Sequence, residues 1–244
     1  MYVSSITADT IEKTPYLVQF LDKKGNLFCV GTLIRPQYVV TAAHCFPNED
    51  GRQTTVIAGA SDKAAENIKR TISKIKIHDQ YDARTMHSDV AVVKLNQPLE
   101  EGERIKTIQM CSSELRKGIF VQIPGWNEAS NKKPLTKQLR TISARYAPEA
   151  MCKQYFGRYV QHENMFCVFG KEVKGLCTGD SGSPAVYRNE FCAINSFGHW
   201  CNHGGQPNAL TSVYKVREFI EKTIEDMEHD IEEYDYDDYS DYDY

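Results

Sequence analysis

Short strand-like segments, separated by glycine, proline and polar turns, recur along the whole chain and limit the folds open to it. They fall at residues 16–21, 27–34, 38–41, 54–59, 71–77 and 90–95, and then at 119–123, 138–143, 165–168, 185–187, 191–197 and 209–213. Helical spacing of apolar residues is confined to 147–155 and 213–227. Many short strands and few helices predict an all-β barrel or sandwich, here in two strand-rich halves.

The cysteine count indicates where such a protein works. The chain has 244 residues, enough for one large domain or two packed halves, and its eight cysteines include no Cys-x-x-Cys pair. An even number of this size predicts disulfides and an oxidising compartment. No apolar run reaches the ~20 residues of a membrane span. The first five residues also lack the charged and then apolar order of a leader. We expect a secreted protein read without its leader.

The stretch 175–184, Gly-Leu-Cys-Thr-Gly-Asp-Ser-Gly-Ser-Pro, sets Ser181 between glycines and directly after an acid. A serine hydroxyl attacks a carbonyl well only when a base takes its proton and N–H donors receive the oxyanion. The flanking glycines allow a sharp turn in which amide groups converge on one point. By itself the stretch fits a simple turn equally well.

Two further segments supply the missing groups. His44 ends an apolar strand in Thr41-Ala42-Ala43-His44-Cys45, and Asp89 precedes another in Ser88-Asp89-Val90-Ala91. With Ser181 the chain order is His, Asp, Ser, which is the order of the chymotrypsin triad. The alternative is that His44 and Asp89 are separate structural residues.

Together with Gly179-Asp180-Ser181-Gly182 and Ser196-Phe197-Gly198, these motifs resemble the chymotrypsin/trypsin-like serine proteases over roughly residues 3–227. The resemblance implies two packed antiparallel six-stranded β-barrels with the active site between them. We expect the barrels at about 16–107 and 108–213, a C-terminal helix at about 213–227 and a disordered tail at 228–244.

The resemblance also implies roles for single residues. Ser181 matches the nucleophile, His44 the base and Asp89 the acid that orients the imidazole. The backbone N–H groups of Gly179 and Ser181 match the oxyanion hole. The implied activity is that of a serine endopeptidase, a hydrolase of protein or peptide substrates.

The substrate-binding positions depart from the trypsin pattern. The matching positions are Gly175, Leu176, Ser196, Gly198 and Asn208. Ser196 matches the serine that bonds the triad acid, and Ser196 and Gly198 match the strand that pairs with a bound peptide. Glycine replaces aspartate at the pocket bottom, so a preference for Lys or Arg is not expected. Leu176 and Asn208 predict a small or shallow neutral pocket and an apolar P1 residue, the residue whose carbonyl is attacked.

Activation in the family needs a freed Ile or Val amine that pairs with the acid before the nucleophile, which is Asp180 here. Val3 is the best match for that amine and Ile6 the next. Neither follows Arg or Lys. A zymogen-like or inactive homologue, acting as a binding or inhibitory protein, therefore remains the alternative to an active enzyme.

Three disulfides are implied by the resemblance, and a fourth follows by elimination. The implied pairs are Cys29–Cys45, Cys152–Cys167 and Cys177–Cys201, which leaves Cys111–Cys192. A zinc site at His199, Cys201 and His203 lacks a fourth ligand at a sensible spacing. The segment 61–70 contributes only Asp62 and Glu66 as acids, too few oxygens for calcium. We expect no metal and no cofactor.

The C-terminal stretch is acidic and rich in tyrosine. It holds eight acids and no base from residue 230 onward, so the net charge of −4 conceals a body of about +4. Its five tyrosines, Tyr234, Tyr236, Tyr239, Tyr242 and Tyr244, are candidate sulfation sites. Such a run cannot bury a core. It is either a solvated tail or a docking segment for a basic protein surface. Nucleic acid is disfavoured as a partner, and we expect a monomer.

Overall fold

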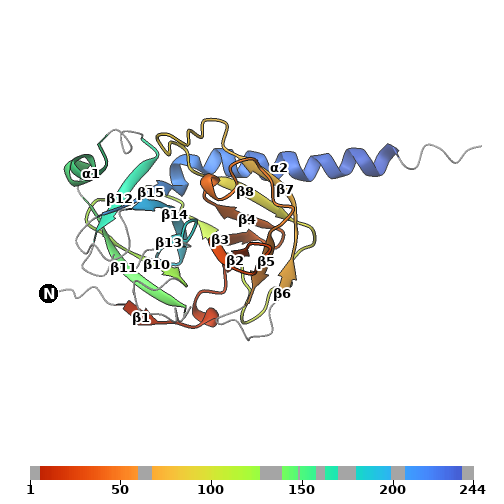
Figure 1. Ribbon diagram of the computed structural model, residues 1–244, viewed down its shortest axis with the longest axis horizontal. Helices are drawn as coiled ribbons and strands as arrows, with labels where there is room; N and C mark the ends of the chain where they lie inside the picture. Colours follow the sequence, from red (N-terminus) through yellow and green to blue (C-terminus); the bar gives the residue numbers. More distant parts are fainter. Residues whose placement is uncertain are drawn as a thin grey trace, which may run out of the picture.

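The computed structural model describes residues 6–59, 68–126, 139–147, 149–157, 163–169, 180–198 and 207–237. Two curled β-sheets lie side by side, and a long helix runs along one side of the molecule (Figure 1). The first sheet comes from the N-terminal half of the chain and the second mainly from the C-terminal half.

Seven strands form the N-terminal sheet in the order β6-β5-β2-β3-β4-β8-β7. They are β2 (Leu17–Leu21), β3 (Leu27–Arg35), β4 (Tyr38–Thr41), β5 (Thr55–Ala58), β6 (Ile68–Arg70), β7 (Ile72–Ile77) and β8 (Ala91–Leu95). Only Thr71 separates β6 from β7, so these two form one bent strand that pairs with β5 at one end and β8 at the other. The sheet thereby curls into a barrel around buried residues such as Phe20, Leu33 and Val93.

The C-terminal sheet follows the order β1-β11-β10-β13-β14-β15-β12 and closes because β12 also pairs with β11. Its strands are β1 (Ile6–Ala8), β9 (Gln109–Met110), β10 (Phe120–Gly125), β11 (Arg140–Tyr146), β12 (Met165–Phe169), β13 (Pro184–Tyr187), β14 (Glu190–Gly198) and β15 (Asn208–Ser212). Strand β1 adds to the edge at β11, and β9 pairs in parallel with β14. The predicted pair of antiparallel β-barrels is confirmed.

Helical structure is limited to η1 (Ile11–Lys13), η2 (Ala43–Cys45), α1 (Glu149–Phe156) and α2 (Val213–Asp237) among the described residues. Helix α2 buries one apolar stripe, and its members are Val213, Val216, Ile220, Ile224 and Met227. This stripe packs into one core cluster with residues of both barrels, among them Val40 and Val92 from the first and Phe191 and Ile194 from the second. The helix therefore holds the two barrels together.

Polar contacts anchor α2 at both ends of this stripe. Near its start, Arg217 Nη1 donates to the carbonyl oxygen of Cys111 at 3.3 Å. Further along, the buried Lys94 Nζ donates to the carbonyl oxygen of Met227 at 2.6 Å, and Arg35 pairs with Glu228 at 3.1 Å. The anchored stripe ends at Met227, where the sequence predicts the end of the helix.

The helix itself continues to Asp237 and extends past the N-terminal barrel (Figure 1). Residues 228–237, which the sequence analysis assigns to the disordered tail, are therefore helical. Extending an existing helix fixes one residue for each hydrogen bond gained, so an anchored segment propagates where an isolated one would not form. No helix in the described part of the chain is both long and apolar enough to cross a bilayer.

Candidate active site

His44 and Asp89 meet because of the pairing between β4 and β8. Thr41, at the end of β4, lies opposite Ala91, at the start of β8. The η2 turn after β4 carries His44, and Asp89 immediately precedes β8. His44 Nδ1 lies 2.8 Å from Asp89 Oδ2, and the His44 backbone N–H donates to Asp89 Oδ1 at 2.9 Å. Both carboxylate oxygens thus contact one histidine.

Asp89 is fully buried, and the second barrel holds it from the other side. The Ser196 hydroxyl, on β14, donates to Asp89 Oδ2, the oxygen that also contacts the imidazole. Thr211 Oγ1, on β15, donates to the Asp89 carbonyl oxygen at 3.3 Å. A buried carboxylate needs such partners, since an unpaired one would be protonated. Residues of both barrels therefore form hydrogen bonds to Asp89 and hold it in place.

The neighbouring Ser88 is a strained and buried residue that is also held by the second barrel. Its φ of +51° lies in the left-handed region, which non-glycine residues rarely adopt. Asn164 Nδ2, just before β12, donates to Ser88 Oγ at 2.8 Å. This contact ties the turn that presents Asp89 to the C-terminal barrel.

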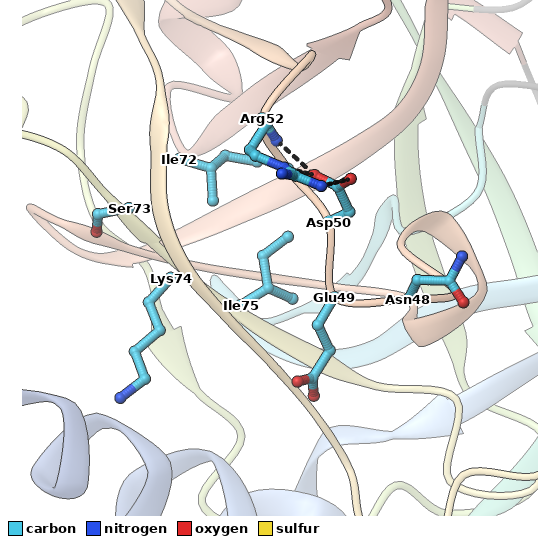
Figure 2. Close-up of a pocket in the computed structure, with 9 residues that line it drawn as sticks. Asn48, Glu49, Asp50, Arg52, Ile72, Ser73, Lys74 and Ile75 are labelled. Atoms are coloured by element: carbon cyan, nitrogen blue, oxygen red, sulfur yellow. Dashed lines mark hydrogen bonds and ion pairs between the residues drawn. The ribbon is translucent and has the colours of Figure 1, made fainter.

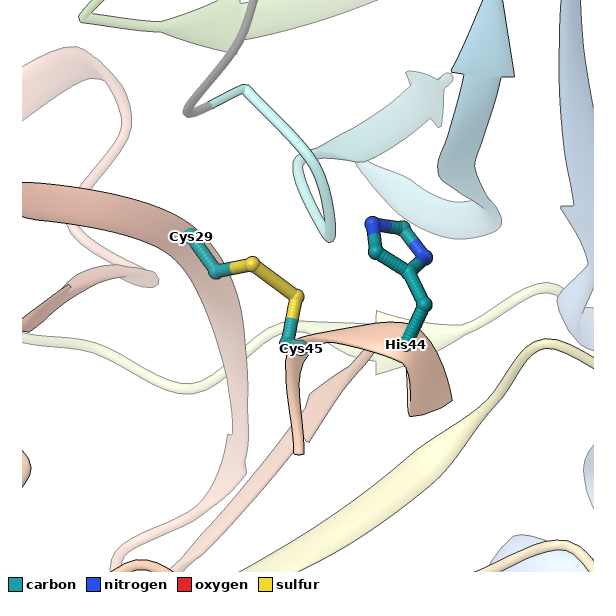
Figure 3. Close-up of side chains that lie close together, drawn as sticks. All are labelled: Cys29, His44 and Cys45. Carbon is teal, nitrogen blue, oxygen red and sulfur yellow. A yellow bond between two sulfur atoms is a disulfide. The ribbon is translucent and has the colours of Figure 1, made fainter. Parts of the chain in front are cut away.

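The surroundings of His44 shift its protonation. Burial by itself lowers the pKa of His44, but the hydrogen bond and the negative charge of Asp89 outweigh it and raise the pKa above its usual value. The side chain still keeps 26% of its surface exposed, so solvent or a ligand can reach it. Figure 3 shows the ring standing beside the Cys29–Cys45 disulfide, which joins β3 to η2.

Ser181 lies on a loop pressed against the first barrel. Gly182 adopts a φ of +83°, and a Cβ placed there would overlap the Val30 carbonyl oxygen and the Thr41 hydroxyl. The Val30 N–H donates to the Ser181 carbonyl oxygen at 2.8 Å. Since Thr41 leads into η2, this packing brings Ser181 to the side of the barrel that carries His44. The Ser181 hydroxyl and the His44 ring, both in the described part of the chain, form no hydrogen bond. Such bonds are often long until substrate binds.

Asp180, the acid before Ser181, is buried with 1% of its surface exposed. Its Oδ1 accepts the Trp126 N–H at 3.1 Å, and any side chain at Gly125 would overlap that oxygen. Its carbonyl oxygen accepts the Ser183 N–H at 3.1 Å. Val3, the predicted partner of this acid, lies outside the described residues.

Only part of the predicted substrate pocket lies in the described part of the chain. Gly175, Leu176 and Gly179 lie outside it. Asn208, at the start of β15, is 5% exposed and lies against the end of β14, where a Cβ on Gly198 would overlap its amide. The amide of Asn208 therefore occupies space beside the strand predicted to pair with a bound peptide.

Sequence reasoning did not single out Asn195, Thr211 or Asn164, although each contacts the segments that carry Ser181 or Asp89. For Asn195 a signal was available. Residues 191–194 of this strand are all apolar, which predicts that both faces of the strand are buried. The amide of Asn195, which follows them directly, is then a buried polar group that requires hydrogen-bond partners.

Three disulfides lie within the described residues: Cys29–Cys45, Cys111–Cys192 and Cys152–Cys167. These are three of the four pairs named from the sequence, and the fourth, Cys177–Cys201, lies outside the described residues. The described residues include two clusters with metal-ligand types, Cys29-His44-Cys45 and Cys111-Glu190-Cys192. Each contains a disulfide, whose sulfurs are not the thiolates that metals require.

A polar hollow of about 300 Å³ lies between the loop after η2 and strand β7 (Figure 2). Three of its charged residues, Glu49, Asp50 and Arg52, are engaged with one another or with backbone. Asp50 pairs with Arg52 at 2.9 Å, and Glu49 Oε1 accepts the Ile77 N–H at 2.8 Å. The arrangement explains how this loop is held next to β7.

Two packed β-barrels, with a half-buried histidine paired to a buried aspartate between them beside the loop that carries Ser181, define the chymotrypsin-like class. The sequence model of the family described as Trypsin matches residues 3–220. The chain belongs to the trypsin family of serine proteases.

Individual relatives agree with this assignment. The chain is 35% identical to Seminase of Drosophila melanogaster over 82% of this chain and 74% of Seminase. It is 32% identical to Hypodermin-B of Hypoderma lineatum over 89% of this chain and 85% of that protein. The structure of neuropsin, a serine protease expressed in the limbic system of mouse brain, superposes with a TM-score of 0.81 at 20% identity. That match covers 90% of this chain and 99% of neuropsin, and it shows the shared fold.

Proposed function

We propose that the protein is a secreted serine endopeptidase in which Ser181, His44 and Asp89 form the catalytic triad. The contact between His44 Nδ1 and the buried Asp89 Oδ2, at 2.8 Å, carries the proposal. It leaves Nε2 as the nitrogen available to Ser181, whose loop packs beside the strand leading to His44.

In this proposal Ser181 Oγ attacks the carbonyl carbon of the peptide bond, and His44 Nε2 takes its proton. The carbonyl oxygen becomes an oxyanion, which the N–H groups of Gly179 and Ser181 receive. Asp89 stabilises the positive imidazolium. His44 then gives its proton to the leaving amine, which departs and leaves an acyl-enzyme. Water, deprotonated by His44, then attacks the ester carbonyl. The bond to Ser181 Oγ breaks, the carboxylic acid product leaves, and His44 returns the proton to Ser181 Oγ.

Labelling with a serine-directed fluorophosphonate tests this proposal. The processed protein should form one covalent adduct, and Ser181→Ala should form none. His44→Ala, which keeps the serine and removes its base, should react far more slowly. A processed and folded protein that does not react would contradict the proposal.

A second candidate is a zymogen-like or inactive homologue that works as a binding or inhibitory protein. The observation that favours it is that neither Val3 nor Ile6, the candidates for the amine that would pair with Asp180, follows Arg or Lys. In the active form we infer that the amine of Val3 pairs with the buried Asp180. Comparing labelling before and after cleavage in front of Val3 separates the two candidates, because only the enzyme gains reactivity.

For specificity we infer a small or shallow, neutral pocket that takes an apolar P1 residue. Gly175 supplies no negative charge for Lys or Arg, and Leu176 adds apolar surface. Asn208, packed on Gly198, narrows the space beside the peptide-binding strand. A cleavage profile from a peptide library checks this inference, and a profile dominated by Arg or Lys at P1 would overturn it.

The acidic C-terminal segment is inferred to be sulfated and to dock on a basic surface of a partner protein. The inference rests on its eight acids and five tyrosines, beside a body of about +4. Secretion, supported by the three described disulfides, would give its tyrosines access to sulfation. The intact mass of natural protein should show increments of about 80 Da, the mass that one added SO3 group contributes. Removal of 238–244 should weaken binding to basic proteins and leave cleavage of small peptides unchanged. We expect the enzyme to act as a monomer.

A further inference from the structure

Asn195, in the middle of β14, makes three hydrogen bonds to the loop 180–183. Its backbone N–H donates to the Ser183 carbonyl oxygen at 2.8 Å, and its carbonyl oxygen accepts the Gly182 N–H at 2.8 Å. Its side-chain Nδ2 donates to the Asp180 carbonyl oxygen at 2.9 Å. With 4% of its surface exposed, Asn195 is a buried amide that holds the residues on both sides of Ser181.

The other end of this side chain faces the predicted substrate pocket. Asn195 Oδ1 accepts the Asn208 Nδ2 at 3.4 Å. The orientation is fixed from one side, because only an amide nitrogen can face the Asp180 carbonyl oxygen. The oxygen must then face Asn208 and requires a donor there. One amide group therefore joins the loop that carries Ser181 to the side chain packed on Gly198.

An apolar side chain of the same shape could fill this place but not make these bonds. With leucine at position 195, the Asp180 carbonyl oxygen would lose a donor and the buried Asn208 Nδ2 would lose its acceptor. The two main-chain bonds of residue 195 need no side chain, so they remain possible in the leucine variant. Substitution of the side chain therefore isolates what the amide contributes.

We infer that Asn195 is a positioning residue, which fixes the Ser181 loop relative to Asn208 through its side-chain amide. The inference rests on the proposed peptidase function. The hydrogen bonds of Asn195 go to the loop that carries Ser181 and to Asn208, so its effect on the reaction would be indirect. Asn195 positions the Ser181 hydroxyl and the backbone N–H groups around it. Loss of the amide should therefore destabilise the transition state more than it weakens the binding of substrate.

The main test is Asn195→Leu, measured by the second-order rate of fluorophosphonate labelling and by kcat and KM on a short peptide. We expect labelling and kcat to fall about 10- to 100-fold, the scale of a small misplacement of a reacting group. KM should change much less. Ile142→Val, a buried substitution in β11 of the same barrel, is the matched control and should leave the labelling rate unchanged.

Asn195→Asp supplies a second readout that a purely structural role would not move. When ionised, the new carboxylate can only accept hydrogen bonds. Its oxygen would then repel the Asp180 carbonyl oxygen, because both atoms carry negative charge and neither has a proton to donate. When protonated, it can donate there again. The ratio of variant to wild-type labelling should therefore rise as the pH falls, while the titration of His44 cancels in the ratio.

The outcomes separate this inference from the proposed function. Wild-type protein that never labels contradicts the function itself. Wild-type protein that labels, with a folded Asn195→Leu variant that labels equally fast, overturns the positioning role alone. If the leucine variant does not fold, the aspartate variant decides, and a ratio that is constant with pH overturns the inference.

Discussion

Asp89→Asn is the substitution whose effect the structure defines most fully. The two oxygens of Asp89 have different partners. Oδ1 accepts the backbone N–H of His44, and Oδ2 accepts from the Ser196 hydroxyl and contacts His44 Nδ1. A backbone N–H can only donate, so the amide oxygen of asparagine must face it. The amide nitrogen then takes the place of Oδ2 and donates to His44 Nδ1.

This arrangement moves the imidazole proton to Nε2, the nitrogen that must accept the proton of Ser181. The Ser196 hydroxyl can rotate to accept from the new amide, so the fold should tolerate the change. We expect kcat to fall about 10⁴-fold, as the wrong tautomer does in a serine protease triad. This loss corresponds to about 5.5 kcal/mol of transition-state stabilisation.

The assay is kcat on a short peptide, together with ¹⁵N spectra of the His44 ring, which identify the protonated nitrogen. Asp89→Asn should place the proton on Nε2 at neutral pH, and the thermal midpoint should stay near that of the wild type. A variant with kcat within tenfold of the wild type, or with the proton still on Nδ1, would refute the reasoning.

Four further predictions concern other parts of the account. Because the pKa of His44 is raised, the acid limb of kcat/KM should lie above pH 6.5. For the same reason, the stability that the His44–Asp89 pair adds should be fully present below about pH 6.5 and lost as the pH rises through the raised pKa of His44. Urea unfolding measured at a series of pH values can follow this loss. Gly182→Ala should destabilise the protein by about 1–3 kcal/mol and lower the labelling of Ser181. Alanine is strained at φ +83°, and its Cβ would overlap the Val30 carbonyl oxygen. Unchanged labelling would contradict this packing. Ile224→Ala should lower the free energy of unfolding by about 2–5 kcal/mol in urea, because this 1% exposed side chain fills the core shared by both barrels; a loss below 1 kcal/mol would mean that α2 does not hold them together.

The sequence predicts the strand-rich architecture well, because the strands of closed antiparallel sheets are short apolar segments separated by glycine, proline and polar turns, and such segments can be recognised locally. Motifs also pointed to His44 and Asp89, which the β4–β8 pairing then joins at 2.8 Å. Tertiary contacts leave weaker traces. The contacts of Asn195 with Asp180 and Asn208 depend on how β14 lies beside a loop and another strand, which no local pattern encodes.

The end of α2 shows a different limit of sequence reasoning. The apolar stripe stops at Met227, and the acidic residues beyond it predict disorder by composition. The helix continues because its preceding turns are already fixed by Lys94 and by the core between the barrels. Composition describes an isolated segment, whereas this segment starts from an anchored helix end.

The central claim is that Ser181 is the nucleophile, and trapping the acyl-enzyme tests it most directly. The processed protein would be mixed with an activated ester, quenched in acid within one turnover, and examined by intact mass and peptide mapping. The account predicts one acyl group, located on Ser181, that disappears in Ser181→Ala and forms far more slowly in His44→Ala. An acyl group on another residue, or none in the folded and processed protein, would contradict it.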